Sequence, residues 1–140
     1  MKNFILSLFT VFILTSCQEK KAEIFDVNLL NGYWEIEKVT MADGTKKEYK
    51  MSETVDFFEV KNDSGFRKKV KPQLDGTYLV NDSEEEIKIE KSAEGTFISY
   101  KTDYATWKEE IKTLTEEQLV LENDQNLQYQ YKRPIPFTVK

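Results

Sequence analysis

Short runs of alternating apolar and polar residues fill the chain from Tyr33 onward. Ile87 and Ile89, for example, alternate with charged neighbours, as in antiparallel strands that have one buried and one solvated face. Clusters of Gly, Asn, Asp and Ser separate the runs and mark turns. The pattern predicts strands at residues 33–41, 54–61, 66–71, 77–80, 86–90, 96–102, 105–113, 119–122 and 127–133.

Few positions predict anything other than a strand. Residues 24–30 could form one helical turn, and residues 115–117 resemble the start of a capped turn. The neighbours Phe57 and Phe58 break the alternation of their strand, which predicts a bulge there. Consecutive strands without crossover helices form either a sandwich or a closed barrel, and only closure removes the exposed edges. We therefore expect an all-β fold, an antiparallel up-and-down β-barrel of about eight strands.

The first residues differ from the rest of the chain. One cation, Lys2, precedes an apolar run over residues 4–14 that only Ser7 and Thr10 interrupt, which is the shape of a secretory signal. At roughly 1.5 Å per residue this run would span about 16 Å, against about 30 Å for the hydrocarbon core of a bilayer. We therefore expect cleavage rather than a permanent transmembrane helix.

The signal ends in Leu14-Thr15-Ser16-Cys17, which resembles the cleavage motif of bacterial lipoproteins. The resemblance implies that residues 1–16 are removed and that Cys17 carries acyl chains such as palmitate. Residues 17–23 would then be a polar tether and residues 24–140 the folded domain. The alternatives are an ordinary signal peptide or a buried free thiol. Because more than one acyl chain gives stable anchoring, we expect a cell-envelope protein held in the outer membrane, with its leaflet and face left open.

Composition excludes several classes of function. The chain has no His and a single Cys, which rules out His-based catalytic triads, metal sites built on His or on a thiolate cluster, and internal disulfides. We expect no metal and no cofactor. Loss of Lys2 with the signal makes the net charge one unit more negative than the −5 of the full chain. A protein this acidic is not expected to bind nucleic acid or to adhere electrostatically to anionic lipid.

Three short elements occur in an order that is similar to the lipocalins. Gly32-Tyr33-Trp34 starts the first strand after a short helical turn, Thr102-Asp103-Tyr104 lies between two strands, and Arg133 ends the last strand. The resemblance covers residues 24–133 and is nearest to short lipocalin-like lipoproteins of Bacteroidetes. It implies that Trp34 closes the base of the barrel and that Arg133 covers the indole ring, with about 1 kcal/mol of cation–π attraction. It also implies that Asp103 bonds the backbone donors of a tight turn.

If Trp34 points inward, the alternation within each strand assigns eight further side chains to the barrel interior. They are Ile36, Phe57, Ile89, Phe97, Trp107, Ile111, Leu121 and Tyr129. These side chains either line an apolar ligand pocket or fill a plain core.

Most charged residues are expected outside the barrel. The basic run at residues 67–71 alternates with Phe66 and Val70, which favours an exposed strand face, and Glu84-Glu85-Glu86 favours a solvated loop. Glu109 shares a face with Trp107, so it lies either at the barrel mouth or, as we favour, exposed near a strand end.

No constellation of residues predicts catalysis, and nothing singles out a pair of carboxylates for acid–base chemistry, so we do not expect an enzyme. We expect a membrane-anchored binder or carrier of a small apolar or amphipathic molecule. The alternative is a filled barrel that acts as an interaction module and docks another cell-envelope protein through its surface.

Overall fold

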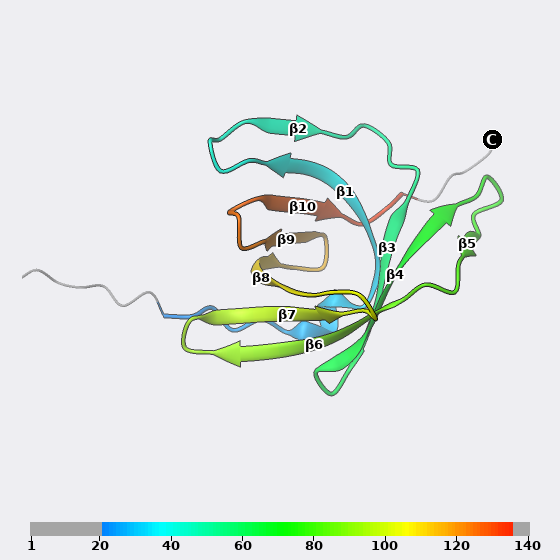
Figure 1. Cartoon of the computed structure of the whole chain (residues 1–140). Helices are drawn as coiled ribbons and strands as arrows, with labels where there is room; N and C mark the ends of the chain where they lie inside the picture. The colour runs from blue at the N-terminus through cyan, green and yellow to red at the C-terminus, as the bar shows by residue number, and fades with distance from the viewer. Residues whose placement is uncertain (1–20, 136–140) are drawn as a thin grey trace, which may run out of the picture.

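The computed structural model describes residues 21–135 (Figure 1). The expected signal peptide and the Cys17 acylation site lie outside this part of the chain. One turn of 3-10 helix, η1 (Val27–Leu30), precedes the strands, and no helix within residues 21–135 is long and apolar enough to cross a bilayer. The strands are β1 (Gly32–Thr40), β2 (Lys46–Glu48), β3 (Val55–Lys61), β4 (Ser64–Pro72), β5 (Tyr78–Val80), β6 (Glu85–Ser92), β7 (Gly95–Lys101), β8 (Thr106–Leu114), β9 (Gln118–Glu122) and β10 (Gln128–Lys132).

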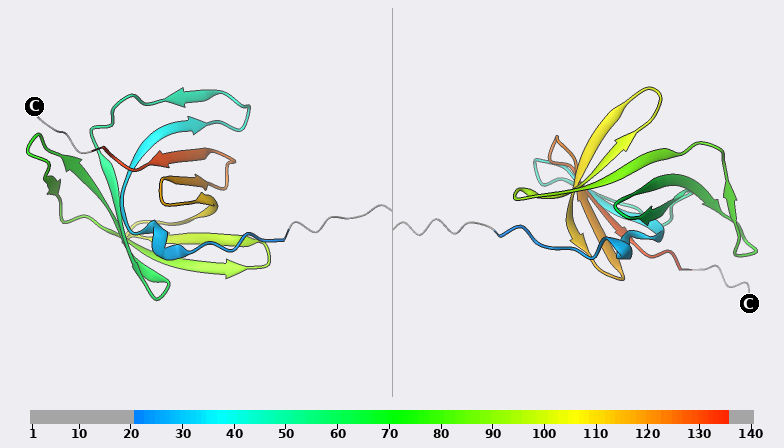
Figure 2. Two further views of the ribbon diagram at one scale, coloured as in Figure 1. Left: turned by 180° about the vertical axis from the view of Figure 1, so that it is seen from behind. Right: turned by 90° about the horizontal axis from the view of Figure 1, so that it is seen from below.

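Eight of these strands close into an antiparallel barrel. Neighbouring strands follow the order β10-β9-β8-β7-β6-β4-β3-β1, and β1 pairs with β10 to complete the ring. Figure 2 shows the ring from behind and from below. The expected all-β, up-and-down barrel is therefore confirmed.

The two remaining strands extend the ring at its rim. β2 pairs with β1 beyond the end of β3, and β5 pairs with β4 beyond the end of β6. β2 and β3 together thus form one barrel strand that a loop interrupts. β5 and β6 form a second interrupted strand in the same way. All nine predicted strands are present, with ends shifted by at most two residues. The pattern does not reveal β2, because its three residues are all charged and exposed.

One continuous apolar core lies inside the barrel. Its members with at most 2% exposure are Leu30, Trp34, Phe58, Ile87, Ile98, Tyr100, Ile111, Leu119 and Leu121. The bulge expected at Phe57 and Phe58 is wrong, because β3 and β4 pair there without a register shift. Shifts occur instead in the β1–β10 pairing after Ile36 and in the β8–β9 pairing after Ile111.

The closed end of the barrel is built around the fully buried side chain of Trp34. Trp34 Nε1–H donates a hydrogen bond to the carbonyl oxygen of Leu30 at 2.8 Å. The guanidinium carbon of Arg133 lies 3.6 Å from the indole ring centre, where the resemblance puts it. Arg133 also donates hydrogen bonds to the carbonyl oxygens of Leu29, Asn31, Tyr33 and Glu116. Both ends of the domain therefore meet at this base.

Gly32 makes room for this contact. Its φ of +107° is a conformation that other residues rarely adopt, and a Cβ atom at this position would lie 3.1 Å from Arg133 Nη1. Glycine therefore serves both the backbone path and the approach of the arginine.

The turn between β7 and β8 has a different anchor from the expected one. Thr102 Oγ1 accepts hydrogen bonds from the backbone N–H groups of Tyr104 and Ala105, at 3.3 and 3.1 Å. Asp103 is exposed and bonds to no backbone donor among the described residues. The role expected of Asp103 is therefore wrong, because the neighbouring threonine hydroxyl holds the turn.

A second, smaller apolar layer covers part of the outer wall. The β4–β5 hairpin projects at one side of the barrel (Figure 2), and its Tyr78 stacks on Tyr33 with ring centres 4.1 Å apart. Val55 and Val70 are only 2% exposed although they point away from the lumen. Both faces of β3 and β4 are thus partly buried.

Candidate functional site

Two adjoining hollows lie in the lumen and share the side chains of Lys69, Tyr129 and Tyr131. The larger hollow has a volume of about 300 Å³, and its other walls are Trp34, Ile36, Val39, Tyr49, Ser52, Thr54 and Asp56. The smaller has a volume of about 260 Å³, and its other walls are Arg67, Trp107, Glu109 and Asn123. Together they have the size and the mixed apolar and polar lining of a small-molecule site.

Six of the eight side chains that the alternation assigned to the interior lie inside the barrel. The buried core contains Ile89, Ile111 and Leu121. Partly buried beside it, and bordering the two hollows, are Ile36, Trp107 and Tyr129. Contact between any of these residues and a ligand stays a prediction.

Phe57 and Phe97 are wrongly assigned, because both point away from the lumen. Their neighbours Phe58 and Ile98 are fully buried in the core instead. Each strand has two adjacent apolar residues at this point, so alternation alone does not determine which one faces inward. Phe57 packs on the outer wall against Tyr33, with ring centres 4.8 Å apart.

The lumen also contains the positively charged side chain of Arg67, which the sequence pattern places on the outer face. Arg67 of β4 is only 8% exposed, and its Nε donates a hydrogen bond to the Glu85 carboxylate of β6. The guanidinium carbon lies 4.4 Å from the centre of the Tyr100 ring. An exposed face is therefore wrong for Arg67, because the apolar neighbours Phe66 and Val70 are the ones that face outward. A solvated loop is equally wrong for Glu85.

Two further carboxyl groups approach this cation. Glu109 Oε1 of β8 lies 3.7 Å from Arg67 Nη1, and the Glu109 side chain is buried, so the exposure that we favoured is wrong. Asp56 of β3 is also buried and pairs with Lys69 Nζ at 2.8 Å. The alternation hides this cluster, because its members are spread over four strands that only barrel closure brings together.

The environment shifts the protonation of this cluster. Burial raises the pKa of the Glu109 carboxyl. Arg67 and the Tyr100 hydroxyl oppose this shift, and the charges of Asp56 and Glu85 add to it. Burial likewise raises the pKa of Tyr100 well above its usual value. Burial disfavours the charge of Arg67, but Tyr100 and the surrounding carboxylates favour it more, so that the pKa of Arg67 is raised and it stays protonated.

Two buried polar atoms of the cluster have no hydrogen-bond partner among the described residues. They are the Tyr100 hydroxyl oxygen and Glu109 Oε1. Because buried polar atoms are ordinarily paired, this part of the lumen is suited to a polar partner. In the part of the chain that the structure describes, no group of three or more acidic, His or Cys side chains could hold a metal ion.

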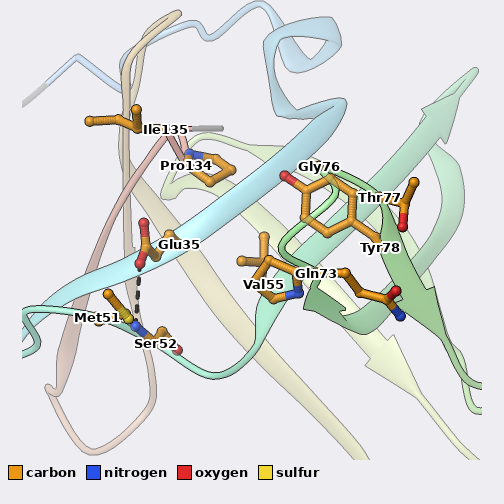
Figure 3. Close-up of a pocket in the computed structure, with 11 residues that line it drawn as sticks. Glu35, Met51, Ser52, Val55, Gln73, Gly76, Thr77, Tyr78, Pro134 and Ile135 are labelled. Atoms are coloured by element: carbon orange, nitrogen blue, oxygen red, sulfur yellow. Dashed lines mark hydrogen bonds between the residues drawn. The ribbon is translucent and has the colours of Figure 1, made fainter. Parts of the chain in front are cut away.

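Three further hollows lie outside these two. One, of about 310 Å³, lies between residues 21–25 and the strands β7 and β8. Two more lie on the outer wall. One, of about 50 Å³, lies beneath the β4–β5 hairpin (Figure 3), where Ser52 N–H donates a hydrogen bond to Glu35 Oε1 at 3.3 Å. It has room for little more than water. The other is a groove of about 420 Å³ over β6, β7 and β8, bordered by Lys88, Lys101 and Lys108. These lysines are exposed, so the groove lacks the buried charges that distinguish the lumen.

A comparison with known protein families agrees with the barrel fold. The sequence profile of the lipocalin-like domain matches residues 30–121, which is more than half of the chain. The chain belongs to the lipocalin-like domain family. Lipocalin-like domains are in general binders rather than enzymes, and their barrel is of the binder or carrier type.

Two crystal structures resemble this lipocalin-like domain. A lipocalin-like protein from Bacteroides uniformis has a TM-score of 0.51 and 16% identity, and the match covers 76% of this chain and 99% of that one. An uncharacterised protein from Bacteroides eggerthii has a TM-score of 0.49 and 11% identity, with 74% and 98% covered. At such low identity the first similarity shows the fold alone. Among curated proteins, none matches the chain.

Proposed function

We propose that this lipocalin-like domain is a non-enzymatic binder or carrier of a small amphipathic molecule, which it holds in the lumen. One observation carries the proposal: the lumen has two adjoining hollows, of about 300 and 260 Å³, where aromatic side chains surround a buried charged cluster. Apolar burial at about 25 cal/mol per Å² supplies affinity for the apolar part of a ligand. The buried polar groups orient its head.

We also propose that the domain is tethered to the outer membrane through acylated Cys17. The Leu14-Thr15-Ser16-Cys17 motif supports this proposal, and residues 17–23 would keep the barrel close to the lipid surface. A barrel in that position has ready access to amphiphiles that leave the membrane.

A filled barrel that docks another cell-envelope protein is the second candidate. Exposed apolar residues favour it, among them Leu79 and Val80 of β5 on the outer wall, and Tyr104 in the turn between β7 and β8, which is 98% exposed. In this case the outer wall rather than the lumen would carry the function.

Native mass spectrometry of the protein purified from its own host's envelope, followed by organic extraction, separates the two candidates. A discrete small molecule that is released on denaturation would support the carrier and identify its ligand class. A protein mass without any bound molecule in repeated preparations would favour the docking module instead.

A further inference from the structure

The charged side chains of the lumen form two complete ion pairs, and the carboxyl group of Glu109 is the one that remains outside these pairs. Lys69 Nζ pairs with Asp56 at 2.8 Å, and Arg67 Nε pairs with Glu85. Glu109 approaches Arg67 only to 3.7 Å, which is too long for a hydrogen bond. The cluster therefore has one net negative charge when Glu109 is ionised and none when it is protonated.

Arg67 presents unused donors to the smaller hollow. Within the described residues its side chain donates a hydrogen bond through Nε, to Glu85, which leaves Nη1 and Nη2 without an acceptor. Arg67 borders the hollow together with Lys69. The two outer nitrogens of a guanidinium form a planar fork that fits a carboxylate through two parallel hydrogen bonds.

Glu109 borders the same hollow and is also short of a partner. Its side chain is 7% exposed, and that of Tyr100 is 1% exposed. The Tyr100 hydroxyl lies near Glu109 and lowers the pKa of its carboxyl, but neither Glu109 Oε1 nor the Tyr100 hydroxyl oxygen has a partner in good hydrogen-bond geometry within residues 21–135. One ligand head in this hollow could therefore reach both Arg67 and Glu109.

Side chains from several strands determine the protonation of Glu109. The titratable groups that face it are Asp56 of β3, Arg67 and Lys69 of β4, Glu85 of β6, Tyr100 of β7, and Tyr129 and Tyr131 of β10. Burial has the largest effect and raises the pKa of the Glu109 carboxyl, so that it takes up a proton more readily than an exposed glutamate.

We propose, resting on the lumenal binding function above, that the ligand is an amphiphile with a carboxylate head, which binds the Arg67 fork while Glu109 takes up one proton. The ligand carboxylate then replaces Glu109 as the second counter-charge of Arg67. The protonated Glu109 carboxyl becomes a donor and gives a hydrogen bond to the ligand head. One negative charge enters with the ligand and one proton enters from solvent, so the net charge of the cluster does not change.

The walls of the two hollows fit such a molecule better than a cationic one. Trp34, Ile36 and Val39 border the larger hollow and offer an apolar surface for a tail. A cationic head that reached the Glu109 carboxylate would also lie beside the Arg67 guanidinium, whose Nη1 is 3.7 Å from Glu109 Oε1, and would be repelled by it. It would also find the face of the Tyr100 ring already covered by the Arg67 guanidinium.

Three probes with the same decyl tail test the head group: decanoate, decanol and decyltrimethylammonium. Isothermal titration calorimetry of the purified chain would measure each Kd between about pH 6 and about pH 8, where decanoate is ionised. We expect decanoate to bind most tightly, with a Kd that rises by up to about tenfold per pH unit as Glu109 loses its proton. Buffers of different ionisation enthalpy should show uptake approaching one proton per decanoate.

Glu109→Gln isolates the role of the proton, because the carboxamide does not titrate. We expect this variant to bind decanoate with a Kd that is independent of pH and without proton uptake. Glu110→Gln is the matched control, since Glu110 is the next residue on β8 and pairs on the outer wall with Lys112 at 3.0 Å. It should keep the pH dependence of the wild type.

Arg67→Lys gives an independent measurement, because it retains the charge and removes the fork. We expect it to weaken decanoate binding by about tenfold or more and to leave decanol binding unchanged. Tighter binding of either other probe, or the same pH dependence in wild type and Glu109→Gln, would overturn the carboxylate assignment and leave lumenal binding standing. If none of the three probes bound, both the carboxylate assignment and lumenal binding would be rejected for this class of ligand.

Discussion

At the scale of single residues, the lumen is unusual because it buries charges that do little for stability. A buried ion pair loses much of its attraction to the cost of desolvation, and apolar replacements of similar volume are often as stable. Arg67 and Glu109 are each less than a tenth exposed and face one another without a hydrogen bond. Their placement therefore fits the proposed recognition of a ligand head better than a role in the stability of the fold.

Glu109→Gln should stabilise the empty protein in a pH-dependent way. The pKa of Glu109 is raised in the folded state, mainly by burial, so its favourable contribution is complete below the unfolded pKa and is lost as the pH rises through the folded pKa. Gln cannot ionise. The stability advantage of the variant over the wild type should therefore grow with pH across that window and then stay constant.

Urea midpoints at acidic and neutral pH would measure this advantage, with Glu110→Gln as the control that should show no such trend. A difference between wild type and Glu109→Gln that is the same at every pH would contradict the burial of an ionisable Glu109.

Trp34→Ala should destabilise the domain by about 3–5 kcal/mol, the range for a fully buried aromatic side chain. It removes the ring that Arg133 covers and the hydrogen bond to Leu30. Trp107→Ala is the matched control. Because Trp107 is only partly buried, its substitution should lower the free energy of unfolding by less. Chemical denaturation would give both values, and an unchanged midpoint for Trp34→Ala would contradict its place at the base.

At the scale of elements, the alternation of the sequence was enough to find the strands, but not always to orient them. Residues 86–90 alternate cleanly, and Ile87 and Ile89 point inward. Residues 57–58 and 97–98 are pairs of apolar neighbours, and only the strand pairing decides which member is buried. In β4 the apolar positions Phe66 and Val70 face outward, because the β4–β5 hairpin adds a second apolar layer there.

The charged cluster of the lumen could not be predicted for a related reason. Its members lie on β3, β4, β6 and β8, and each reads as an ordinary polar position within its own strand. Their proximity results from closure of the barrel. By contrast, Trp34 and Arg133 were predictable, because their positions at the two ends of the domain resemble a known family.

The turn between β7 and β8 offers a test at this scale. Thr102→Val removes the hydroxyl that accepts two backbone hydrogen bonds and should destabilise the domain by about 1 kcal/mol. Asp103→Asn, one residue further on, should have almost no effect. Thermal unfolding of both variants would measure this, and the opposite ranking would restore the role first expected of Asp103.

At the scale of the whole molecule, the proposed anchoring through Cys17 would set where the barrel operates. An exported Cys17→Ala protein should leave the membrane fraction and appear among the soluble envelope proteins, because it lacks the acyl chains. Fractionation with antibody detection would measure its distribution. Ser16→Ala keeps a small residue before the cysteine and is the control that should remain with the membrane. Retention of Cys17→Ala as firm as that of the wild type would contradict lipid anchoring.

The clamp of Arg133 over Trp34 also has a kinetic consequence. Its hydrogen bonds to Leu29, Asn31 and Tyr33 join residues that are 104, 102 and 100 positions apart. Synthesis delivers Trp34 long before Arg133, so the pairing of β1 with β10 must wait until the last strand of the barrel has been made. The base of the barrel is therefore finished late. A chain that ends before β10 leaves Trp34, its largest fully buried side chain, uncovered, and this is the kind of surface that chaperones and proteases recognise.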